Sequence, residues 1–283
     1  MLTRHFLFPV IITSLTNSLI DGQSAKEQLA LANSARLTSE KFYDEIPFKD
    51  QLGYIIVPLK MGENTYDYIF DTGGFNTATS EVIKNAGLSA LMEVETGSSN
   101  KLKSKTKLLK IPALQIGKAT FQYVGVFNFD FLASPIINCN TNGGLIGKSI
   151  IRDAVWQIDH RKSIIRVLDM LENMPFTGEG KRIKIKLGKT FNPFLVIYIN
   201  GKQVECMLDL GYGGLLSLTE KTAASLNIKN SIATEGEGDV GANGILNEKI
   251  FVEKLDNLTI GKTELKNKIA FYSNYNNHNL LRS

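Results

Sequence analysis

Two aspartates stand in similar surroundings in the two halves of this 283-residue sequence. Asp71 follows the apolar run 68–70 and precedes Thr-Gly-Gly, and Asp209 follows the apolar run 206–208 and precedes Leu-Gly. A carboxylate directly after a buried strand costs free energy unless that place needs it. Two such carboxylates in duplicated settings predict a site built from a pair of acids, the group that general acid–base chemistry uses.

The segments around the two aspartates repeat in the same order. Residues 54–70 and 194–208 each predict a strand, a turn with glycine or asparagine, and a second strand that ends at the aspartate. A Gly-rich loop follows each aspartate, and then a short helix is predicted over 79–88 and 219–226, with a threonine at each N-cap. These features predict an internal repeat.

The repeat continues through a flexible turn and a strand in each half. Glycine-rich turns are predicted at 97–100 and 241–244, and strands that end at a turn glycine at 111–117 and 255–261. The first copy then has Gly144-Leu-Ile-Gly147 before a hairpin at 155–167. The second copy reaches residues 279–283 without such a hairpin. We expect its closing segment to be missing from a truncated chain; the alternative is a second lobe that is natively shorter.

The motifs around Asp71 resemble one lobe of a retropepsin-like or pepsin-like aspartic protease. The resemblance rests on Phe-Asp-Thr-Gly at 70–73, the turn at 97–100 and Gly-Leu-Ile-Gly at 144–147, and it covers residues 50–283. Two such lobes in one chain are similar to bacterial exported aspartyl protease-like proteins. The resemblance implies an all-β acid protease fold, with two closed β-barrel lobes related by pseudo-twofold symmetry.

The resemblance also implies roles for particular residues. Asp71 and Asp209 would be the catalytic pair of an aspartic-type endopeptidase, sharing one proton because two close carboxylates do not both ionise cheaply. Thr72, Gly73 and Gly211 would support the pair: glycine lets the backbone approach a carboxylate, and Thr72 would brace the two loops. The remaining residues, Gly97, Ser98, Gly241, Ala242 and Asn243, would form flaps over an extended peptide substrate.

Leu210 departs from the pattern of that family. A leucine side chain can neither donate nor accept the hydrogen bond that the family's Thr or Ser makes at this position. An alternative is therefore a catalytically inactive relative that still binds peptides or proteins, with Asp209 as a turn residue. A third hypothesis is self-association of the first lobe, with Asp71 supplied by each of two chains. A monomer with two pseudo-dimeric lobes is the expected state.

Composition excludes several other classes of function. Net charge is +4, from 32 basic and 28 acidic residues, so nothing favours a nucleic-acid partner. The three histidines and two cysteines lack the spacing of metal ligands, and no cofactor is expected.

The segment 143–149 is similar to the end of a phosphate-binding loop. Asn142 stands where that motif needs glycine, and a strand hairpin is expected next, so nucleotide binding is rejected. Cys139 and Cys206 could pair in an exported protein or remain two buried thiols.

The ends and boundaries of the chain complete the sequence-based prediction. A short basic start and an apolar stretch from Phe6 predict an export signal, and hence a periplasmic, cell-surface or secreted protein, with no stable membrane span after its removal. The predicted parts are a signal peptide (1–25), an N-terminal segment with a helix and an edge strand (26–48), a first lobe (49–168), a linker (169–184) and an incomplete second lobe (185–283).

Overall fold

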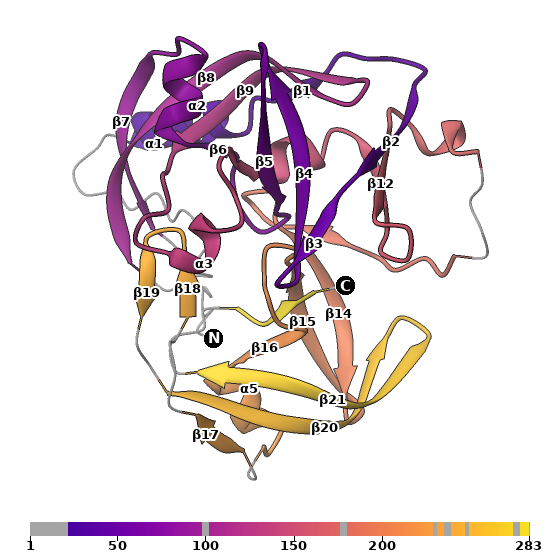
Figure 1. Cartoon of the computed structure of the whole chain (residues 1–283). Coiled ribbons are helices and arrows are strands. Elements are labelled where there is room, and N and C mark those ends of the chain that lie inside the picture. The colour runs from indigo at the N-terminus through magenta and orange to yellow at the C-terminus, as the bar shows by residue number, and fades with distance from the viewer. Residues whose placement is uncertain are drawn as a thin grey trace.

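The computed structural model is mainly β, which confirms the predicted fold class. It describes residues 22–97, 102–175, 180–228, 231–234, 239–246, 249–273 and 278–282. Within these residues, two large sheets lie in the two halves of the chain (Figure 1), and short helices connect some of their strands. We call the part built on the first sheet the first lobe, and the part built on the second sheet the second lobe.

The first lobe contains a nine-stranded sheet in the order β1-β9-β8-β4-β5-β10. Three further strands pair at its sides: β3 with β4, β6 with β9, and β7 with β8. Its strands are β1 (Arg36–Leu37), β3 (Lys49–Gln51), β4 (Tyr54–Met61), β5 (Asn64–Phe70), β6 (Thr77–Ala78), β7 (Ala90–Gly97), β8 (Lys103–Ile116), β9 (Ala119–Asn128) and β10 (Gly144–Ile146).

A smaller three-stranded sheet packs onto the first lobe. Its order is β11 (Val155–Asp159), β12 (Ile164–Leu168) and β2 (Tyr43–Pro47), with antiparallel pairing throughout. The hairpin predicted at 155–167 is therefore present, and β2 is the edge strand predicted in the N-terminal segment. Ile165 and Val167 of β12 are fully buried and join the core of the first lobe.

The second lobe contains an eight-stranded sheet in the order β13-β14-β15-β22-β16-β21-β20-β17, and a separate two-stranded hairpin, β18–β19. Its strands are β13 (Lys186–Leu187), β14 (Pro193–Ile199), β15 (Lys202–Leu208), β16 (Leu216–Thr219), β17 (Ile232–Thr234), β18 (Asp239–Gly241), β19 (Gly244–Leu246), β20 (Ile250–Ile260), β21 (Thr263–Ser273) and β22 (Leu280–Leu281).

The helices are short, and two of them occupy matching places in the lobes. In α2 (Ser80–Asn85) and α5 (Glu220–Ser225), the N-cap threonine accepts a hydrogen bond from the backbone amide three residues on, as predicted. The remaining helices are α1 (Gly22–Ala32), α3 (Pro135–Asn138), α4 (Lys148–Ile151) and the 3₁₀ helix η1 (Leu171–Asn173). Among the described residues, no helix is long and apolar enough to cross a membrane.

The same strand arrangement holds both aspartates. In the first lobe β10 pairs in parallel with β5, and the amide of Asp71 donates to the carbonyl oxygen of Ile146 at 2.9 Å. In the second lobe β22 pairs in parallel with β15, and the amide of Asp209 donates to the carbonyl oxygen of Leu281 at 2.9 Å. Leu280–Leu281 in the second lobe therefore pairs with the strand before the aspartate and accepts a hydrogen bond from its amide, as Leu145–Ile146 does in the first lobe.

Several sequence-based expectations are settled by the described residues. Both cysteines are free, and the expectation of two buried thiols is wrong for Cys139, which is exposed because it caps the surface helix α3. A four-residue helix, α4, precedes the hairpin at 155–167, which was predicted to be the next element after Gly147. The export signal stays a prediction, since residues 1–21 lie outside the described residues.

Candidate functional site

Asp71 and Asp209 lie at the ends of two central strands, where the lobes meet. Asp71 directly follows β5 and Asp209 directly follows β15. Each is almost completely buried, with 4% of Asp71 and 5% of Asp209 exposed. A pair of carboxylates buried to this degree needs compensating hydrogen bonds and a shared proton.

Each aspartate lies directly against the glycine of the opposite loop. A Cβ atom added at Gly73 would lie 2.5 Å from Oδ2 of Asp209, and one added at Gly211 would lie 2.5 Å from Cγ of Asp71. Ordinary Cβ atoms do not approach other atoms so closely. The two Asp-X-Gly loops therefore face each other, and the absence of a side chain at both glycines is what lets the carboxylates meet.

Backbone amides support both carboxylates. Oδ1 of Asp71 accepts from the amides of Gly73 at 2.8 Å and Gly74 at 2.9 Å, and Oδ1 of Asp209 accepts from the amide of Gly211 at 2.9 Å. Burial raises the pKa of Asp71 above its usual value. The two amides, a side-chain hydrogen bond with Asp209 and the charge of Lys148 act in the opposite direction. This is the environment of a carboxyl pair that can hold one proton.

Thr72 braces the second loop from the first. Its Oγ1 donates to the carbonyl oxygen of Leu208 at 2.7 Å and accepts from the amide of Leu210 at 3.0 Å. The side chain of Leu210 is 4% exposed and packs into the core cluster of the first lobe. The hydroxyl of Thr72 in the first loop is therefore hydrogen-bonded to the backbone of the second loop. The side chain of Leu210 in the second loop makes an apolar contact with the first lobe.

Lys148 is a site residue that the sequence did not assign. It begins α4, directly after the Leu-Ile-Gly motif, and only 2% of it is exposed. Nζ donates to Oδ1 of Asn192 at 2.9 Å and lies 3.7 Å from the centroid of the Phe75 ring. Burial lowers the pKa of Lys148 to about 7. The negative charges of Asp71 and Asp209 raise this pKa, but burial has the larger effect. The only feature of the sequence that could have indicated this site is a single lysine within the apolar and small residues of 143–151.

Tyr54 and Arg282 also lie within electrostatic reach of this site. Burial is the main cause that raises the pKa of Tyr54 to about 12, and the negative charges of Asp71 and Asp209 contribute. Arg282 partly offsets this rise, and its guanidinium lies where a side chain at Gly53 would stand. The phenol of Tyr54 therefore stays neutral at physiological pH.

The predicted flap of the second lobe contacts the first lobe. The hairpin β18–β19 reaches toward β7 and α3 (Figure 1), and the side chain of Asn243 at its tip donates to the carbonyl oxygen of Leu102 at 2.8 Å and accepts from Oγ of Ser104 at 2.7 Å. Ala242 is buried against Tyr54 and its neighbours. Gly241 and Ala242 thus lie over the first lobe. In the other predicted flap, Gly97 ends β7 and is buried, whereas Ser98 lies outside the described residues.

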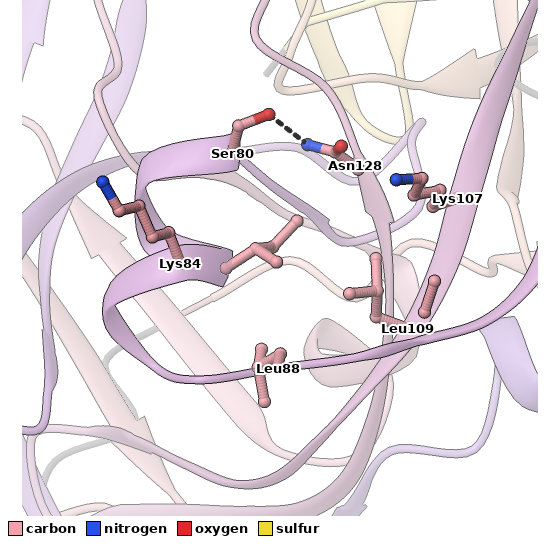
Figure 2. A pocket seen from close by; sticks show the side chains of 8 residues that line it. Ser80, Lys84, Leu88, Lys107, Leu109 and Asn128 are labelled. Carbon is pink, nitrogen blue, oxygen red and sulfur yellow. Dashed lines mark hydrogen bonds between the residues drawn. The ribbon is translucent and has the colours of Figure 1, made fainter.

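A separate pocket lies on the first lobe beside α2. Figure 2 shows the side chains that line it, among them Lys84 of α2, Lys107 of β8, Leu88 and Leu109. The side chain of Asn128 donates to Oγ of Ser80 at 3.2 Å there. The pocket includes none of the residues around the aspartate pair. Among the described residues, no three His, Cys, Asp or Glu side chains gather in a way that could hold a metal ion.

Comparison with known proteins gives a distant structural likeness. No protein-family model and no curated protein matches this sequence. Among solved structures, the chain is similar to a retropepsin-like aspartic protease from Rickettsia conorii. The two are 18% identical, with a TM-score of 0.27, over 37% of this chain and 80% of that chain.

Proposed function

We propose that this protein is an aspartic-type endopeptidase in which Asp71 and Asp209 activate a water molecule. The observation that carries this proposal is the reciprocal contact of each carboxylate with the glycine of the other loop. Two buried acids in this arrangement share a proton, so that one is ionised and the other protonated. This is the pair of states that general base and general acid catalysis needs on one site.

The reaction follows from these two states. The ionised carboxylate takes a proton from a bound water while the water oxygen forms a bond to the carbonyl carbon of the peptide. The protonated carboxyl gives its proton to the carbonyl oxygen, and a tetrahedral diol results. As the diol collapses, the carbon–nitrogen bond breaks and the leaving nitrogen receives a proton from the protonated carboxyl. One diol hydroxyl gives its proton to the ionised carboxylate, so a carboxylic acid product forms and the pair again holds one proton. The hairpin tip at Gly241, Ala242 and Asn243 would cover an extended peptide.

Cleavage of a peptide library from acidic to neutral pH tests this proposal. We expect wild-type protein to cleave, and Asp71→Asn and Asp209→Asn each to lose at least about a thousandfold in kcat/KM, as expected when one of two residues that act as a unit is removed. Asp256→Asn is the matched control, since Asp256 is an exposed residue of β20. Equal activity in Asp71→Asn and wild type would rule out chemistry at the pair.

A second candidate function is peptide binding without cleavage. It is favoured by Leu210, which packs into the first lobe and supplies no hydroxyl to the pair. Fluorescence polarisation with the same labelled peptides separates the two candidates. Binding that is unaffected by Asp71→Asn, with no product over the whole pH range, would support the binding protein and contradict the peptidase.

A further inference from the structure

The buried ammonium group of Lys148 has no role in the mechanism above, although the charges of Asp71 and Asp209 act on it. Its backbone amide donates to the carbonyl oxygen of Gly74 at 2.9 Å, which fixes the start of α4 against the loop that carries Asp71. Its side chain then runs inward to the Phe75 ring and to Asn192. Burying a lysine costs free energy unless opposite charge and hydrogen bonds compensate it.

Asn192 connects this lysine to the second lobe. Asn192 precedes β14 and is 3% exposed. Its Oδ1 accepts from Nζ of Lys148 at 2.9 Å and from Oγ1 of Thr190 at 2.6 Å, and its Nδ2 donates to the carbonyl oxygen of Gly73 at 2.8 Å. The amide group of one residue of the second lobe therefore fixes both the lysine and the Asp-Thr-Gly loop of the first.

Lys148 brings a positive charge within electrostatic reach of the carboxyl pair. Two carboxyls that share one proton carry one negative charge, and the ammonium carries one positive charge. Asp71 and Asp209 are the charged groups that act on Lys148, while Phe75, Asn192 and Thr190 around it are uncharged. The phenol of Tyr54 is neutral, and Arg282 carries a further positive charge that acts on that phenol.

We propose that Lys148 is a positioning residue that sets the protonation state of the Asp71–Asp209 pair, with its ammonium group held in place across the lobes by Asn192. Its effect on cleavage rests on the proposed peptidase activity, whereas its effect on the titration of the pair does not. The charge of Lys148 lowers the pKa of Asp71, so the pair reaches its singly ionised state at a lower pH than it would alone.

Titration of the carboxyl groups by NMR tests the inference without any substrate. With ¹³C-labelled aspartate, we expect the resonance of Asp71 to titrate at higher pH in Lys148→Met than in wild type, and Lys148→Arg to restore the wild-type behaviour. Lys110→Met is the matched control: Lys110 also lies over an aromatic ring, Tyr123, with Nζ 4.4 Å from its centroid, but it is exposed. Identical titration of Asp71 in folded Lys148→Met and wild type would overturn the inference.

The reciprocal measurement keeps the test independent of how well Lys148→Met folds. In wild-type protein, we expect the Nζ resonance of Lys148 to titrate near its lowered pKa of about 7. Neutralising the pair with Asp71→Asn and Asp209→Asn removes the charges that favour the ammonium, so Lys148 should titrate at still lower pH. An unchanged Lys148 titration in the double variant contradicts the proposed coupling.

The pH profile of cleavage separates this inference from the peptidase proposal. In Lys148→Met we expect kcat/KM on the acidic side to fall by about tenfold relative to neutral pH, since a nearby opposite charge typically shifts a carboxyl by at least one unit. Lys148→Arg should recover the acidic side. Coupled titrations without any cleavage would reject the peptidase but keep the inference. Cleavage with the same pH profile in wild type and Lys148→Met would keep the peptidase and reject the inference.

Discussion

The hydroxyl oxygen of Thr72 accepts a hydrogen bond from the backbone amide of Leu210, across the interface between the lobes, at a distance of 3.0 Å. The same hydroxyl donates to Leu208. The side chain of Leu210 contacts the first lobe in turn and is buried in its apolar core. The two loops are thus joined by one polar brace and one apolar contact.

Loss of the polar brace should loosen the pair without removing an acid. We expect Thr72→Val to lower the free energy of unfolding by about 2 kcal/mol, because the amide of Leu210 and the carbonyl of Leu208 lose a buried partner. We also expect a lower kcat, since the two carboxylates are held less firmly. Urea denaturation and peptide cleavage measure the two effects. Thr72→Ser keeps the hydroxyl and should stay close to wild type; a loss as large as that of Thr72→Val would contradict this role.

Loss of the apolar contact should affect stability more than chemistry. Leu210→Ala removes a buried leucine side chain at the lobe interface, so we expect a loss of about 2 to 5 kcal/mol in the free energy of unfolding. Leu132→Ala is the matched control, since Leu132 is 79% exposed and its change should stay within about 0.5 kcal/mol. Equal stability of the two variants in thermal unfolding would show that Leu210 does not join the lobes.

The glycines of the two loops should tolerate no side chain. We expect Gly73→Ala and Gly211→Ala each to reduce kcat by on the order of a hundredfold, because the new Cβ must push the opposing carboxylate aside. Gly213→Ala is the control in the same loop as Gly211: its Cβ would meet its nearest atom, the hydroxyl oxygen of Tyr54, at 3.9 Å. Full activity in Gly73→Ala would mean that the close contact is not needed for catalysis.

The second lobe should lose stability in mild acid through His278. This side chain stacks edge-on against Phe194, and burial lowers its pKa to about 4 from an ordinary 6.5. Between these values the unfolded chain binds a proton that the folded protein does not, so stability falls as the pH drops through this window. We expect His278→Gln to remove about 3 kcal/mol of that pH dependence. Urea unfolding from neutral to acidic pH measures it, and parallel curves for both proteins would contradict it.

Much of the arrangement around the aspartates followed from local sequence patterns. Alternating apolar residues, turn glycines and N-cap threonines predicted β4–β5, β14–β15, α2 and α5, because each of these features depends on neighbours in the chain. The repeat of those features placed Asp71 and Asp209 at matching positions. The strand at Leu280–Leu281 was too short to show such a pattern, and only its parallel pairing with β15 revealed it.

The sequence by itself determined the mainly β fold and the two acids, since strand periodicity and a repeated Asp-X-Gly turn are local and need no knowledge of packing. Only the tertiary structure decided that these acids meet through their glycines, that Leu210 enters the first-lobe core, and that Lys148 lies buried beside the pair. The physical reason is that the environment of a buried charge depends on segments far apart in the chain: Asn192 holds Lys148, and the charge of Asp209 acts on it, only once the lobes have packed together.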